Sequence, residues 1–274
     1  MMWGLFEHAF MQHALIAGLC AGVSCGLVGV FVVTMQLSLL GVCVAHAAFA
    51  GAMLGIWAGF DPIWGALAFS LGAAAFVGPL ADRGQLNPDS AVGIVFSFML
   101  GLAFLFVGLM PGAKTQALSL FWGNILTVST TDLVYLLAVS AVIVLLLVLF
   151  YKEIQAVVCH RHIAYAVGIP ATLVFYGLLF ATGATVAVSL RTVGGLLIYS
   201  LLLNPAAAAL QLTFSLKRMF LLAAVFGVFS CWTGLAGSYF WDLPTGASIV
   251  IASSLIFGLA LALSPKRRMT SWRK

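Results

Sequence analysis

The chain has 274 residues, of which 64% are hydrophobic and only 7% are charged, and its formal net charge is +5. Soluble domains carry about 25% charged residues, so this composition excludes a soluble protein and predicts an all-α, polytopic membrane protein. The basic residues are scattered between apolar runs or gathered at the C-terminus, which indicates membrane orientation rather than a nucleic-acid partner.

Apolar runs follow one another along the chain, and a helix needs about 20 such residues to cross a bilayer. Breaks at charges, prolines and glycine clusters place spans near 10–33, 38–60, 62–81, 91–110, 131–151, 171–189, 192–212, 218–239 and 245–263. The run between Lys114 and Thr130 is too short to cross and indicates a re-entrant or interfacial segment. We therefore expect about nine spans, eight at least and ten at most, in a single transmembrane domain, residues 1–274.

Glycines recur every four residues in the first two predicted spans. They are Gly18, Gly22 and Gly26 in the first and Gly51, Gly55 and Gly59 in the second. Such spacing lets helix backbones approach closely in lipid, so these glycines predict packing faces inside a bundle.

The second predicted span contains His46 in the middle of an apolar sequence. Lipid offers an imidazole no hydrogen-bond partner, so a ligand-capable side chain at this depth indicates a functional site. Cys43 lies three residues earlier on the same helix face, and the pair could offer two ligands to a borderline-soft ion such as Zn²⁺. Spacing alone also allows a neutral histidine bonded to a neighbouring helix, with Cys43 as a small packing residue.

Residues 152–170 form the longest strongly polar segment between predicted spans. Within it, residues 159–167 could form a short helix that stops at Gly168. Its polar cluster consists of His160, Arg161 and His162. Neighbouring positions on a helix point apart, so the segment indicates a docking surface for a cytoplasmic partner more than a metal site made by its two histidines.

The seventh predicted span contains Pro205, which removes one backbone hydrogen bond, leaves a carbonyl near Leu201 without its partner and kinks the helix. Asn204 beside it could bond that carbonyl or face a transport pathway. Kinks of this kind often line transport routes, so both residues are candidate pathway positions, with plain packing as the alternative.

Lysines and arginines predict the orientation of the chain. If the basic tail, residues 264–274, is cytoplasmic, three other basic segments are cytoplasmic too: 82–90, 152–170 and the Lys217–Arg218 turn. Only Lys114 and Arg191 then fall on the opposite side, as the positive-inside rule requires. With nine spans, the N-terminus lies outside.

Several stretches, in order along nearly the whole chain, together resemble the permease subunit of the manganese/zinc/iron-type ABC importers. They are FVVTMQLSLLGVCVAHAAFAGAMLG (31–55), SAVGIVFSFMLGLAFLF (90–106), FWGNILTVSTTDL (121–133), VGGLLIYSLLLNPAAAAL (193–210) and WDLPTGASIVI (241–251). The resemblance implies an all-helical permease of the type II importer class in the bacterial inner membrane, with a divalent metal as transported substrate and no permanently bound cofactor.

The resemblance also implies partners. A second permease copy, two copies of a cytoplasmic ATP-binding subunit and an extracytoplasmic metal-binding protein would complete the importer. The chain itself has no Gly-x-x-x-x-Gly-Lys-Ser/Thr motif, so we expect it not to be an enzyme and to take its energy from the ATP-binding subunit. Residues 159–168 align with the helix that contacts that subunit, which gives coupling roles to His160, Arg161, His162 and Gly168.

The chain departs from the family at its metal site. The family pattern Gly-Asp-Ala-Leu-Ser-His has an Asp four residues before the His, and here Val42 stands at the Asp position while His46 is kept and Cys43 replaces the Ala. Loss of the carboxylate is expected to weaken binding of hard Mn²⁺, whereas a Cys/His face favours Zn²⁺, ferrous iron or copper. A chelated metal is the alternative cargo, because a chelate needs no inner carboxylate.

Proteins of other classes fit the sequence less well. A secondary transporter or channel would want carboxylates within the membrane, whereas Asp61, Asp132 and Asp242 all lie at predicted span ends. A metalloprotease is disfavoured because the chain has no His-Glu-x-x-His motif. An assembly subunit that moves no cargo is a further alternative.

Overall fold

The structure is a computed structural model that describes residues 9–37, 39–84, 88–110, 120, 123, 125 and 128–265. Within these residues all regular elements are helical, which confirms the all-α prediction. The helices are α1 (Ala9–Thr34), α2 (Leu40–Ala58), α3 (Pro62–Gly84), α4 (Pro88–Leu109), α6 (Thr130–Leu149), α7 (Tyr151–Ala166), α8 (Ala171–Thr192), α9 (Gly195–Leu212), α10 (Leu216–Trp241) and α11 (Thr245–Ala262).

Eight helices of the described chain are long and apolar enough to cross a membrane, and α9 contains a shorter apolar stretch, Leu197–Leu212. The predicted spans match α1–α4, α6 and α8–α11 to within three residues at either end. Apolar run length therefore predicted these helices correctly. The segment from Lys114 to Thr130 lies mostly outside the described residues.

Glycines bring several helices into backbone contact. A Cβ atom on Gly22 of α1 would lie 2.6 Å from the backbone of Gly227 in α10, and one on Gly51 of α2 would lie 2.0 Å from the carbonyl oxygen of Gly65 in α3. The predicted packing faces are confirmed at these positions. Gly59 has another role: it ends α2 with φ +79°, a conformation that glycine adopts without strain.

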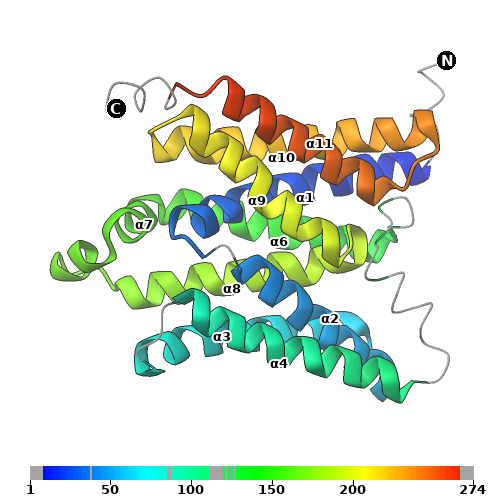
Figure 1. Cartoon of the computed structure of the whole chain (residues 1–274), viewed down its shortest axis with the longest axis horizontal. Helices are drawn as coiled ribbons and strands as arrows, with labels where there is room; N and C mark the ends of the chain where they lie inside the picture. The colour runs from blue at the N-terminus through cyan, green and yellow to red at the C-terminus, as the bar shows by residue number, and fades with distance from the viewer. Residues whose placement is uncertain are drawn as a thin grey trace.

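The long helices run between two ends of the bundle (Figure 1). One end, called the α7 end here, carries α7, the end of α11 and the turn between α9 and α10. The basic residues of α7 and of the start of α10 belong to this end. The opposite end, called the Arg191 end, carries the end of α8 and the starts of α6 and α3. Helices α2, α9 and α11 lie on the side that faces the viewer in Figure 1.

Residues 152–170 are mostly helical rather than a loop with one short helix. Helix α7 begins directly after Phe150 and continues to Ala166, so it is longer than the predicted 159–167 segment. Its backbone leaves the helical conformation at His160, where φ is −152° and ψ is 83°, and this residue kinks the helix. Gly168 follows with φ +86°, which confirms the predicted helix end at a glycine.

Candidate functional site

His46 is half-buried in α2, and its ring is oriented by its own helix. Its Nδ1 atom lies 2.9 Å from the carbonyl oxygen of Val42, one turn earlier. A carbonyl oxygen only accepts hydrogen bonds, so the neutral ring carries its proton on Nδ1 and its lone pair on Nε2. Metal-binding histidines commonly donate their other ring N–H to a backbone carbonyl in this way. The local geometry thus favours the tautomer in which Nε2 is the nitrogen that can bind a metal ion.

The environments of His46 and Cys43 differ. The imidazole packs edge-on against the ring of Phe96 in α4, with ring centroids 5.0 Å apart. Val42 and His46 are both half-buried, whereas Cys43 is fully buried. The two predicted ligands therefore differ in exposure although only three residues separate them. Among the described residues, no group of three or more His, Cys, Asp or Glu could hold a metal ion, so other ligands would have to complete a site.

Asn204 lies near the middle of α9 and bonds to serines rather than to the carbonyl of Leu201. Its Nδ2 atom lies 2.9 Å from Oγ of Ser200, 3.0 Å from Oγ of Ser253 and 3.1 Å from Oγ of Ser254. The last two serines belong to α11, so the amide links two helices. We call these four residues the Asn204 cluster. The i, i+4 spacing of Ser200 and Asn204 could have signalled half of it, but nothing in the sequence pointed to α11.

Pro205 stands inside α9 directly after this amide, and α9 continues on both sides of it, from Gly195 to Leu212. Its ring is buried in the bundle. The structure thus places Pro205 next to the Asn204 cluster. Its packing role and its pathway role both stay predictions.

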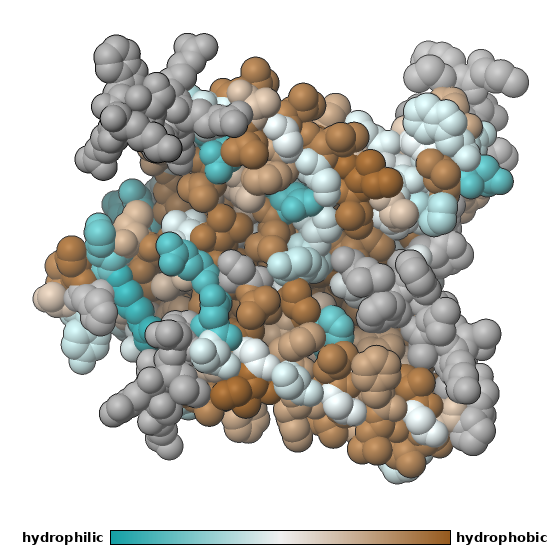
Figure 2. All heavy atoms as spheres, viewed as in Figure 1, coloured by the Kyte–Doolittle hydropathy of each residue, from teal (hydrophilic) through white to brown (hydrophobic). Residues whose placement is uncertain are grey.

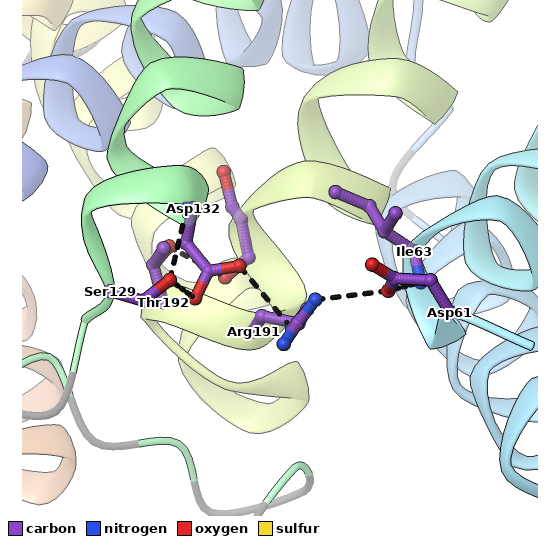
Figure 3. A network of polar contacts seen from close by, with 7 residues as sticks. Asp61, Ile63, Ser129, Asp132, Arg191 and Thr192 are labelled. Carbon is purple, nitrogen blue, oxygen red and sulfur yellow. Dashed lines mark hydrogen bonds and ion pairs between the residues drawn. The ribbon is translucent and has the colours of Figure 1, made fainter.

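A charged network, the Arg191 cluster, is formed by Arg191, Asp61 and Asp132 at the Arg191 end of the bundle (Figure 3). Nη1 of Arg191 lies 3.1 Å from Oδ1 of Asp61, and its Nε lies 3.4 Å from Oδ1 of Asp132. Asp132 also accepts a hydrogen bond from Oγ of Ser129 at 2.7 Å, and Asp61 accepts one from the backbone N–H of Ile63 at 3.1 Å. The sequence predicted these acids as span ends but did not predict that they share one arginine.

The predicted coupling residues lie on or just after α7, at the other end. His160 is exposed, whereas Arg161 is half-buried, with its Cζ atom 4.4 Å from the centroid of the Phe175 ring in α8. This cation–π contact ties the second half of α7 to the bundle, so the arginine faces inward. The side chain of His162 is outside the described part of the structure. The coupling roles of His160, Arg161, His162 and Gly168 stay predictions.

Together these features define a class of protein. A described bundle with eight helices long and apolar enough to cross a membrane is a polytopic membrane protein. The ABC 3 transport family matches residues 7–264, and the chain belongs to this family. It is the permease subunit of an ABC importer and is not itself catalytic.

Several relatives cover nearly the whole chain. The manganese transport system membrane protein MntC of Halalkalibacterium halodurans is 32% identical over 271 residues, which cover 98% of this chain and 93% of that protein. The chelated iron transport system membrane protein YfeD of Yersinia pestis is 30% identical over 256 residues, which cover 93% of this chain and 86% of that protein.

Solved structures show the same fold. PsaBC from Streptococcus pneumoniae in complex with Fab matches with a TM-score of 0.89 at 30% identity, covering 100% of this chain and 98% of that one. An inward-facing metal-chelate type ABC transporter matches with a TM-score of 0.73 at 16% identity, covering 92% and 85%, which supports the fold alone.

Proposed function

We propose that this permease moves a divalent metal ion, manganese, iron or zinc, across the inner membrane of a bacterium, and that His46 binds the ion on its way. The observation that carries the proposal is the Nδ1 contact to Val42, which leaves the lone pair of a membrane-embedded imidazole on Nε2. The manganese and chelated-iron relatives support this class of cargo.

The two ends of the bundle support a proposed assembly. The α7 end would face the cytoplasm and bind two copies of an ATP-binding subunit, one for each of two permease copies. The described basic residues Lys152, Arg161, Lys217 and Arg218 gather there, as the positive-inside rule favours, and the C-terminus would be cytoplasmic too. The Arg191 end would face outward and receive an extracytoplasmic metal-binding protein. Lipid would surround the remaining apolar surface.

A chelated metal is the second candidate cargo. Val42 offers no carboxylate next to His46, and a metal that arrives with its own ligands needs fewer from the protein. The similarity to a chelated-iron permease supports this candidate.

The test of His46 uses the complete importer in proteoliposomes with radioactive Mn²⁺, Fe²⁺ or Zn²⁺. We expect His46→Ala to abolish ATP-dependent uptake, because the imidazole nitrogen is lost. His13→Ala is the matched control, since His13 is also a half-buried histidine in a span but lies near the start of α1, and it should keep uptake. Wild-type uptake by His46→Ala would refute the site.

A second variant tests the sulfur ligand. We expect Cys43→Ser to shift the metal preference away from Zn²⁺ and towards Mn²⁺, because a hydroxyl is a harder ligand than a thiol. Competition between the two ions in the same uptake assay measures the shift. Cys231→Ser, at another buried cysteine, is the control. An unchanged preference would show that Cys43 is a packing residue.

A further inference from the structure

The Asn204 cluster lies where a polar group is most costly in a membrane. Asn204 is close to the midpoint of α9, and Ser253 and Ser254 are close to the midpoint of α11. These positions are far from both ends of their helices and hence from water on either side of a bilayer. Polar side chains at such depth are rare and commonly mark substrate pathways.

The hydroxyl oxygens of the three serines in the cluster converge on the amide nitrogen of Asn204. Oγ atoms of Ser200, Ser253 and Ser254 all lie within 3.1 Å of one amide nitrogen, which has only two hydrogens to share among three acceptors. The hydroxyl of Ser253 donates its own hydrogen to the carbonyl of Val250 at 2.9 Å, so its oxygen accepts both from the amide and from the hydroxyl of Ser200, 3.2 Å away. Three oxygens thus surround a position that a positively polarised group already occupies.

The cluster opens to one side of the chain. Ser253 is buried, Ser200 and Asn204 are half-buried and Ser254 is exposed. Among the described residues, no donor contacts Oδ1 of Asn204. Lipid cannot satisfy that oxygen, so this side must meet water or protein in the assembled importer.

The same side of the molecule carries α2. Helices α2 and α9 both face the viewer in Figure 1, and a Cβ atom on Gly41 of α2 would lie 2.7 Å from a side-chain carbon of Leu202 in α9. In Figure 2 hydrophilic and intermediate residues interrupt the brown surface over these helices. Helix α2, which carries His46, therefore packs beside α9, which carries Asn204.

We propose that the Asn204 cluster is a second cation site on the transport route, where a hard divalent cation such as Mn²⁺ exchanges part of its water shell for the serine hydroxyl oxygens and, once the amide has rotated, for Oδ1 of Asn204. Hard cations prefer such oxygen ligands, and the cluster supplies the oxygens that Val42 does not offer beside His46. This inference rests on the proposed function as a metal permease and names a further site along the same route.

The test measures uptake kinetics of the complete importer for Mn²⁺ and Zn²⁺ in proteoliposomes. We expect Asn204→Leu and Ser253→Ala to raise the apparent KM for Mn²⁺ by about tenfold, the scale of losing a group that supports a metal site, and to change that for Zn²⁺ less. Ser230→Ala is the matched control, because Ser230 is equally buried in α10 but donates to the carbonyl of Phe226 in its own helix. It should leave both KM values unchanged.

Asn204→Asp separates cation binding from helix packing. In a cation site the added carboxylate tightens Mn²⁺ binding, so Mn²⁺ should raise the melting temperature of the purified variant complex more than that of the wild type. In a packing contact the unpaired charge lowers the melting temperature with and without Mn²⁺ alike, and that result would overturn the proposal.

The two proposals fail in different ways. A wild-type complex that moves no metal at all would overturn both the proposed function and the cation site. An active wild type beside variants with unchanged Mn²⁺ kinetics, or with equal loss for both metals, would overturn the cation site alone.

Discussion

Two polar clusters join helices that are distant in sequence, and they differ in charge and in depth. The Arg191 cluster lies at helix ends and uses full charges, one guanidinium between two carboxylates. The Asn204 cluster lies at helix midpoints and uses one amide and three hydroxyls. A charge costs most at the bilayer centre, so depth explains which groups each cluster uses. The chain therefore joins its helices through ion pairs near one end and through neutral polar groups at its centre.

The buried half of the Arg191 cluster should give the largest effect on stability. Asp132 is only 8% exposed, and removing one partner of a buried ion pair leaves the other charge uncompensated. We expect Asp132→Ala to lower the free energy of unfolding by about 3 kcal/mol, the low end of that range because Arg191 keeps Asp61. Denaturant titration in detergent measures the loss. Asp89→Ala, at an exposed acid in the first turn of α4, is the control and should change stability by less than about 1 kcal/mol.

Removing the amide of the Asn204 cluster should lower the free energy of unfolding by an intermediate amount. Hydrogen bonds between membrane helices contribute about 0.6 kcal/mol each, with a maximum near 1.7. Asn204→Leu removes the amide bonds between α9 and α11, and we expect a loss of about 1–2 kcal/mol in the same titration. A loss of stability larger than that of Asp132→Ala would contradict this ranking, because the Asn204 cluster would then stabilise the bundle more than the Arg191 cluster does.

Removing the charge of Asp61, the exposed acid of the Arg191 cluster, should have the smallest effect on the free energy of unfolding. Asp61 and Arg191 have side chains 45% and 32% exposed, and exposed ion pairs contribute at most about 1 kcal/mol. Asp61→Asn keeps an oxygen for the N–H of Ile63 and removes only the charge, so we expect a loss below 1 kcal/mol that shrinks further as salt is added. A salt-independent loss as large as that of Asp132→Ala would show that the two carboxylates act alike.

Much of the fold could be predicted from the sequence, because membrane helices satisfy their own backbone hydrogen bonds and must be apolar for about 20 residues. Run length and the breaks between runs therefore placed α1 to α4, α6 and α8 to α11 correctly. Helix α7 was predicted too short, since it is polar and no membrane constrains its length. Its kink at His160 stands directly before Arg161, whose guanidinium packs on the ring of Phe175 in α8.

The candidate site could be predicted only in part. His46 stood out because an imidazole is rare in an apolar run, but the spacing of Cys43 suggested a shared face and did not reveal that the thiol is fully buried. Asn204 was a candidate through its proline neighbour, while its partners Ser253 and Ser254 come from a helix about 50 residues later. Serines are common in membrane helices, so no local pattern separates those that meet an amide from those that bond their own helix.

The sequence by itself determined which segments cross the membrane, the absence of a nucleotide-binding motif and the presence of one ligand-capable histidine at membrane depth. These properties depend on local composition, because a span must be apolar along its length to be stable in the hydrocarbon core of the bilayer. Only the tertiary structure decided that Asp61 and Asp132 share Arg191 and that an amide of α9 meets hydroxyls of α11. Such pairs depend on how helices cross, and close glycine contacts between α1 and α10 and between α2 and α3 show how closely helices pack in this bundle.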